Sequence, residues 1–227
     1  MSEPLPTLPI AGGAPAEGER ADARRNRERI LCAAARLVER KGPDAVSMDA
    51  VAEEAGVGKG TLYRRFGDRA SLLRALIEEP ERELQESVLR GPPPLGPGAP
   101  PEQRLHAFGD ALIDHLERFA LHIWSAERDG GAGGPASRYR HPVYAFYRTH
   151  VAVLLRELVG EATRADFFAG ALIAPLGAEP YLFERRVRGQ TVEQLRANWH
   201  ALADAILASA RTEANGAQPS RSSATDR

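Results

Sequence analysis

Hydrogen-bond donors of several kinds are concentrated in one short stretch of the chain, residues 59–69. The stretch contains Lys59, Thr61, Tyr63, Arg64, Arg65 and Arg69. Hydroxyl, ammonium and guanidinium groups donate to phosphate oxygens and to base edges, so the chemistry open to this set is the binding of a polyanion. A second cluster, residues 20–41, has eight basic residues against three acidic ones. The net charge of −1 therefore conceals two locally basic regions that can neutralise phosphates.

Composition and length exclude several classes of protein. Of the 227 residues, 43% are hydrophobic and 27% are charged, which is typical of a folded globular chain. The single cysteine, Cys32, cannot form an internal disulfide, as is usual in a reducing cytosol. The N-terminus does not read as a signal peptide, and the most apolar stretch, 169–178, is far shorter than the ~20 residues of a membrane helix. We therefore expect a cytoplasmic protein with no membrane partner.

Apolar residues recur every three and four positions along the chain, and no strand-like alternation persists, which predicts an all-α fold. The expected helices span residues 21–40, 48–55, 59–66, 69–89, 105–123, 142–159, 164–174 and 192–210. Prolines and glycines in residues 91–101 predict a linker or a long loop. The two ends, 1–20 and 212–227, have few large apolar side chains and are expected to be disordered.

Residues 47–66 have the pattern of a helix-turn-helix. Ser47 is expected to cap the first helix with its hydroxyl, and Gly56 supplies the backbone freedom that the turn needs. The apolar side chains expected to pack the two helices together are Ala52, Val57, Leu62 and Phe66. Gly60 allows the second helix to sit close to a groove. Two short helices joined by a glycine-containing turn are the arrangement that inserts its second helix into the major groove of DNA.

The same segment resembles the DNA-binding domain of the tetracycline-repressor (TetR) family. The matching residues are Ala52, Ala55-Gly56-Val57, Gly60-Thr61-Leu62-Tyr63-Arg64-Arg65-Phe66, Asp68 and Leu72-Leu73, within about residues 24–76. The resemblance implies a homodimeric, sequence-specific transcriptional regulator, a repressor that a small-molecule effector releases from double-stranded operator DNA. It also implies that Tyr63 contacts the DNA backbone or a base edge and that Arg69 holds a flanking phosphate.

The residues expected at the DNA combine the donors of the second helix with the start of the first. They are Ser47, Met48, Lys59, Gly60, Thr61, Tyr63, Arg64, Arg65 and Arg69. The chain departs from the family pattern at Gly58, where many members have Ser or Thr, and at Met48, where many have Thr. Gly58 leaves the cap of the second helix to backbone or water. Asp49 would be repelled by phosphate, so we expect it to act on the N-terminus of the first helix.

The resemblance divides the chain at about residue 78. Residues 21–78 would form the DNA-binding domain, and residues 79–211 a helical bundle that binds the effector and forms the dimer through its last two helices. The residues proposed to line the effector pocket are Phe119, His122, Trp124, Tyr144, Tyr147 and Phe168. Taken one at a time, each aromatic residue is more easily explained as part of the core. The last two helices have a second reading as well, in which they only close the core of a monomer.

The sequence also bears on several alternative functions. The run 56–61 looks like a phosphate-binding loop, but Gly60 stands directly after Lys59 where that motif needs Ser or Thr, which argues against an NTPase. No nucleophile, base and orienting group stand at a spacing that demands a helical enzyme. The histidines that could bind a metal, without obvious carboxylate or thiol partners, are His115, His122, His141 and His150. We expect no catalytic residue, cofactor or metal, and a chromosome-coating protein without sequence preference remains an alternative.

Overall fold

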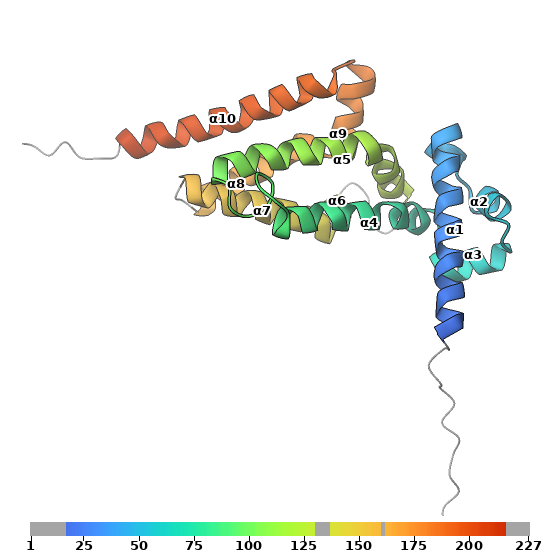
Figure 1. The fold of residues 1–227 in the computed structure, drawn as a ribbon. Coiled ribbons are helices and arrows are strands. Elements are labelled where there is room, and N and C mark those ends of the chain that lie inside the picture. Colours follow the sequence, from blue (N-terminus) through green and yellow to red (C-terminus); the bar gives the residue numbers. More distant parts are fainter. Residues whose placement is uncertain (1–16, 130–136, 160–161, 217–227) are drawn as a thin grey trace, which may run out of the picture.

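The computed structural model describes residues 17–129, 137–159 and 162–216, and every regular element among them is helical, which confirms the all-α prediction (Figure 1). The elements are α1 (Glu17–Lys41), η1 (Pro43–Ala45), α2 (Met48–Ala55), α3 (Lys59–Phe66), α4 (Arg69–Arg90), α5 (Pro101–Asp129), α6 (Ser137–Arg140), α7 (Pro142–Val159), α8 (Ala162–Ile173), η3 (Ala174–Leu176), α9 (Ala178–Leu182), η4 (Phe183–Val187) and α10 (Val192–Gly216). None of the helices in these ranges is long and apolar enough to cross a membrane.

The N-terminal domain consists of α1, α2, α3 and the first turns of α4, which enclose the first of two hydrophobic cores. Its buried residues are Ile30, Ala33, Ala34, Leu37, Val38, Val46, Met48, Val51, Ala52, Ala55, Leu62, Leu72, Leu73 and Ala126. The apolar face that the sequence predicts for α1 is thus the buried one. Ala126 belongs to α5, so the second domain helps to close this core.

Helix α4 belongs to both domains. Leu72 and Leu73, near its start, are buried in the first core, whereas Leu84 and Val88, near its end, are buried in the second. Figure 1 shows α4 running from α1 and α3 into the bundle of α5, α7 and α8. A single helix therefore connects the two hydrophobic cores.

The C-terminal domain is built on α5, which packs against α4, α7, α9 and α10. Trp199 of α10 is buried, and its indole Nε1 donates a hydrogen bond to the carbonyl oxygen of Leu172 at 3.0 Å. The Trp199 ring lies on Gly109 of α5, where a Cβ would overlap the ring. A residue without a side chain at position 109 is therefore required for α10 to dock.

The ends of the chain differ from the prediction. Helix α1 begins at Glu17 and α10 ends at Gly216, so residues 17–20 and 212–216, expected to be disordered, are helical. Each extends a helix that packing already holds, and adding a turn to a formed helix costs little. The remaining parts of both predicted tails, 1–16 and 217–227, lie outside the described residues. The loop at 91–100 is not helical, as predicted, but Leu95 packs against the second core, so the loop is fixed to the domain.

Candidate nucleic-acid interface and ligand cavity

The turn between α2 and α3 is formed as its residues predict. The Ser47 hydroxyl accepts a hydrogen bond from the backbone N–H of Ala50 at 3.0 Å, which caps α2. Gly56 ends α2 in the left-handed conformation, with φ of 62°. A residue with a side chain would be strained there, so glycine fits this position best. Gly58, at the N-cap of α3, makes no side-chain cap, also as expected.

Helix α3 presents one face to the core and the other to solvent. Leu62 is fully buried and Phe66 is half-buried, and together they hold the helix on the first core. Tyr63, by contrast, is 49% exposed, and Arg64 and Arg65 are exposed. The hydroxyl and both guanidinium groups are therefore available to a partner outside the protein.

The first helix adds basic side chains to this exposed face. Arg25, Asn26 and Arg29 of α1 line one surface hollow together with Thr61, Arg64 and Arg65 of α3. The two basic clusters of the sequence, far apart along the chain, thus meet on one side of the N-terminal domain. The acidic Asp22 also lines this hollow and pairs with Arg25. The remaining arginines form a surface that can neutralise several phosphates at once.

Other basic residues of α1 are already paired within the protein. Arg36 and Arg40 bind the Glu54 carboxylate at 3.3 and 2.7 Å, and their hydrogen bonds lower the pKa of Glu54. Arg27 binds Glu78 of α4 at 2.7 Å. Arg29, by contrast, lines the hollow and is hydrogen-bonded to the neutral side chain of Asn26, so its charge is available to a polyanion.

Lys59 and Asp49 form an ion pair between the two short helices. The Lys59 Nζ lies 2.7 Å from a carboxylate oxygen of Asp49, and this hydrogen bond raises the pKa of Lys59. Both side chains are exposed. Asp49 lies in the first turn of α2, where the sequence places it, and it also holds Lys59 at the start of α3.

Two residues expected at the DNA are turned into the protein. The Arg69 guanidinium donates to the carbonyl oxygens of Pro43 and Val46 and, at 3.1 Å, to the Ser125 hydroxyl of α5. Burial lowers the pKa of Arg69. The hydrogen bonds of the guanidinium offset the free-energy cost of moving this charge out of water. The predicted phosphate contact of Arg69 is therefore replaced by a structural one. Met48 is only 6% exposed and packs in the first core, so its expected place at the DNA is wrong as well.

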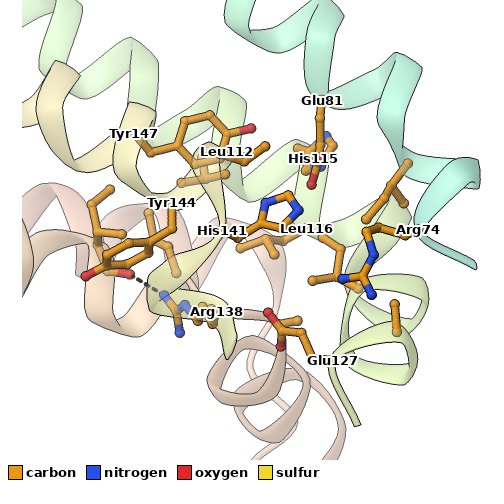
Figure 2. Close-up of a pocket in the computed structure, with 18 residues that line it drawn as sticks. Arg74, Glu81, Leu112, His115, Leu116, Glu127, Arg138, His141, Tyr144 and Tyr147 are labelled. Atoms are coloured by element: carbon orange, nitrogen blue, oxygen red, sulfur yellow. Dashed lines mark hydrogen bonds between the residues drawn. The ribbon is translucent and has the colours of Figure 1, made fainter. Parts of the chain in front are cut away.

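A second site lies in the C-terminal domain, where α4, α5, α7 and the α8–α9 connection surround a cavity. The space not filled by protein atoms is about 660 Å³, part of it open to solvent. Apolar walls come from side chains such as Ile77, Leu112, Leu116 and Ile123. Figure 2 shows polar groups among them, with Glu81 and Arg74 on α4 and Tyr144 and Tyr147 on α7. An apolar cavity with a few polar groups is typical of a small-molecule site.

Of the six residues predicted to line this pocket, Tyr144 and Tyr147 do so, and Phe119, His122, Trp124 and Phe168 do not. Phe119 packs between the rings of His115 and His122, at centroid distances of 5.1 and 6.0 Å. Trp124 lies under the Arg128 guanidinium at 4.6 Å, and Phe168 under that of Arg164 at 5.2 Å. Their side chains pack against these neighbours instead of lining the cavity.

Burial governs the titration of the cavity's polar groups. Burial and repulsion by Glu78 raise the pKa of Glu81 to about 7, and the pull of Arg74 offsets only part of this. Burial lowers the pKa of His115 to about 4 and also lowers the pKa of His141. Burial raises the pKa values of Glu127 and Tyr147. The His115 Nε2 and the Tyr147 hydroxyl have no hydrogen-bond partner among the described residues.

Comparison with protein families identifies the N-terminal domain. Residues 30–76 match the family model of the bacterial regulatory proteins of the tetR family. The chain carries a DNA-binding domain of the TetR family of transcriptional regulators. Several HTH-type transcriptional regulators of Staphylococcus aureus strains are 42% identical to it over 59 residues, which is 26% of this chain and 32% of theirs. The matched stretch thus spans about a third of the length of these curated relatives.

Solved structures share the fold well beyond the TetR domain. A transcriptional regulator from Pseudomonas aeruginosa PAO1 covers 87% of this chain and 97% of its own, with a TM-score of 0.62 and 22% identity. One from Rhodococcus sp. Rha1 covers 81% and 96%, with a TM-score of 0.60 and 21% identity. A regulator from Saccharomonospora viridis, solved in complex with choline, covers 80% and 96%, with a TM-score of 0.57 and 19% identity. These proteins are transcriptional regulators, and this chain shares their fold.

Sequence reasoning missed the charged side chains of the cavity, above all Glu81. A signal for Glu81 was present, since Ile77, Glu81, Leu84 and Val88 follow one another at helical spacing along the buried face of α4. An acidic residue on an apolar stripe is rare unless it is paired or functional. Arg74, Glu127 and Arg138 carry no such signal, because their meeting depends on how the helices of the TetR fold cross.

Proposed function

We propose that this chain is a sequence-specific transcriptional repressor that binds operator DNA as a homodimer and is released by a small-molecule effector. The observation that carries the proposal is the exposed face of α3, with Tyr63, Arg64 and Arg65 beside Arg25 and Arg29 of α1, on a TetR-family domain. Donors of this kind bind phosphates and base edges. Ser47, Lys59, Gly60 and Thr61 belong to the same proposed interface, and the protein would act in the bacterial cytoplasm, where its operator lies.

Dimerisation is proposed through α8 and α10, which contact each other in the C-terminal domain. Both helices leave apolar side chains in solvent, with Phe167 of α8 72% exposed and Leu202 of α10 40% exposed. A second copy of the chain would cover them. The two recognition helices of such a pair would read a two-fold symmetric operator.

Effector release is proposed to act from the cavity between α4, α5 and α7. The regulator from Saccharomonospora viridis holds choline, which supports a small-molecule site in a protein of this fold. Helix α4 lines the cavity with Arg74, Ile77 and Glu81 and begins in the N-terminal domain. An effector that prefers one α4 position weakens DNA binding by the difference of its affinities for the two states.

The interface is tested by measuring the affinity of the protein for DNA from its own upstream region, at fixed salt and with random DNA as competitor. We expect Tyr63→Ala and Arg65→Ala each to weaken specific binding on the order of tenfold or more, a loss of about 1–3 kcal/mol. Arg90→Ala, an exposed arginine at the far end of α4, is the matched control and should leave the affinity unchanged. Loss of binding in neither α3 variant would remove the interface. Equal binding to random DNA would instead favour the chromosome-coating alternative.

A further inference from the structure

Glu81 is a carboxylate held inside the apolar cavity of the C-terminal domain. It is 9% exposed, and none of the residues that the structure describes forms a hydrogen bond or an ion pair with its carboxylate. An isolated buried carboxylate costs several kcal/mol when ionised, roughly, unless an opposite charge approaches it. The cavity therefore contains a binding contact that no side chain of the described protein fills.

Two further polar atoms of the same cavity are left without a partner. The Nε2 of His115, from α5, and the hydroxyl of Tyr147, from α7, are buried and make no hydrogen bond with any described residue. His115 is 8% exposed and Tyr147 is 7% exposed. Figure 2 shows the His115 ring and the Tyr147 hydroxyl on the same side of the cavity as Glu81. The charge of Glu81 contributes to the raised pKa of the Tyr147 hydroxyl, so the two groups lie within electrostatic reach.

The charges around Glu81 decide the sign of the ligand. Glu78 and Glu127 add negative potential at its carboxylate, and only Arg74 opposes them. The second arginine of the cavity, Arg138, donates to the carbonyl oxygen of Ile173 at 3.1 Å and acts on Glu127 rather than on Glu81. At the Glu81 carboxylate the negative potential of Glu78 and Glu127 is offset in part by Arg74, so this end of the cavity favours a cationic ligand.

We propose that the effector of this protein is a protonated amine with an apolar body, whose ammonium group binds Glu81, His115 and Tyr147 while its body lies against Leu112, Leu116 and Ile123. A primary ammonium has three N–H donors, and the carboxylate, the neutral imidazole and the phenol oxygen can each accept one. The remaining wall is apolar and suits a hydrocarbon or aromatic body. The inference rests on the proposed function, because it assigns the chemical class of the effector at that same cavity.

The test compares three probes that share a body and differ in charge: 4-phenylbutylamine, 4-phenylbutan-1-ol and 4-phenylbutyrate. Binding to the full chain is measured by calorimetry at pH 8. We expect the amine to bind at least tenfold more tightly than the alcohol and the carboxylate to bind most weakly. Tighter binding of the carboxylate, or equal binding of all three, would overturn the proposal.

Substitution of Glu81 tests whether the amine binds at this residue or elsewhere on the protein. Glu81→Gln keeps the shape and the burial while removing the charge, and it should weaken the amine at least tenfold and leave the alcohol within twofold. Glu83→Gln, on the exposed side of the same helix, is the matched control and should leave all three probes unchanged. Thermal unfolding of each variant checks that it folds. Undiminished amine binding in a folded Glu81→Gln protein would refute the assignment.

The pH dependence gives an independent readout. Between pH 6 and pH 8 the amine, with a pKa of about 10, stays charged, and Glu81 becomes ionised, so the affinity should rise roughly tenfold. The other groups that face Glu81 are Glu78 and Arg74 on α4, Glu127 and His115 on α5, and His141 and Tyr147 at α7. The pKa of His115, lowered to about 4, keeps its ring neutral in this range, and burial also lowers the pKa of His141. A flat profile for the amine would contradict the role of Glu81.

DNA binding, measured on the same protein without any probe, distinguishes a failure of the proposed repressor function from a failure of the proposed effector class. A protein that fails to bind its operator refutes the proposed repressor function, whatever the probes do. A protein that binds its operator but shows no preference for the amine retains the proposed function and loses this inference.

Discussion

The ionisable groups of the two domains have opposite environments. In the N-terminal domain Tyr63, Arg64 and Arg65 are exposed, and nearby charges such as Lys59 form pairs at the surface. In the C-terminal domain Glu81 and His115 are buried. Burial raises the pKa of Glu81 and lowers the pKa of His115, and both shifts favour the neutral form. Charges that meet a permanent polyanion can stay solvated at no cost to folding. The buried groups of a ligand site instead stay neutral until a bound ligand supplies the missing contacts.

Arg69 is the residue that most directly tests this division, because it is a cation of the DNA-binding domain that is turned inward. Arg69→Ala removes its bonds to Pro43, Val46 and Ser125, and among the described residues only the Pro43 carbonyl oxygen keeps another donor, the Val46 N–H, so we expect a loss of roughly 3 kcal/mol in the free energy of unfolding. Denaturant unfolding measures it. Arg65→Ala is the control and should weaken DNA binding without changing stability. Unchanged stability in Arg69→Ala would return Arg69 to the DNA interface.

The docking of α10 on α5 tests how tightly the second domain is packed. Gly109→Ala places a methyl group where the Trp199 ring lies, and we expect a loss of about 2 to 3 kcal/mol through overpacking. Gly170→Ala in α8 makes the same change where the nearest atom is at an ordinary contact distance of 3.9 Å, and it should be neutral or slightly stabilising. Equal melting temperatures for the two variants would show that α10 is not held by this contact.

Glu81 makes the stability of the C-terminal domain depend on pH. Burial raises its pKa to about 7 in the folded protein, so between the ordinary glutamate pKa of 4.5 and 7 the folded state binds more protons than the unfolded one. Stability is therefore lost as the pH rises through this window. Glu81→Gln should match the wild type at pH 5 and exceed its unfolding free energy by about 2 kcal/mol at pH 8. If chemical denaturation gives the two proteins parallel pH profiles, the buried charge is relieved by other means.

The surface pair at the helix-turn-helix gives the smallest expected effect. Asp49→Asn breaks the ion pair with Lys59, and because both groups are exposed the change in stability should stay within about 0.5 kcal/mol. Operator affinity should rise modestly, since a negative charge leaves the interface and Lys59 is released. A fall in affinity would mean that Asp49 positions Lys59 for its contact with DNA.

Local sequence signals predicted the helix-turn-helix almost to the residue. The start of α2 after Ser47, the turn at Gly56 and the bounds of α3 each depend on neighbours within a few positions. The inward turn of Arg69 could not be predicted, since its acceptors lie 23, 26 and 56 residues away. Met48 was misplaced because a residue at the start of a helix gives no indication of whether its side chain faces the core.

The cavity was predicted less well, and for the same reason. Helical periodicity identifies a buried face but not which neighbouring helix that face meets. Tyr144 and Tyr147 line the cavity, while Phe119 and Trp124, equally aromatic, pack elsewhere. The charged residues of the cavity come from α4, α5 and the segment before α7, and only the crossing of these helices brings them together.

Arg69 and Arg128 bind the short turn between α1 and α2 from two sides. Arg69 reaches the carbonyl oxygens of Pro43 and Val46, and Arg128 of α5 pairs with Asp44. These contacts connect the turn, the first turn of α4 and the last turns of α5 into one rigid unit. Arg74, at the edge of the cavity, lies five residues, or about 7.5 Å along the helix axis, beyond Arg69. A ligand that moves α4 away from α5 would therefore rotate the whole N-terminal domain as a rigid body.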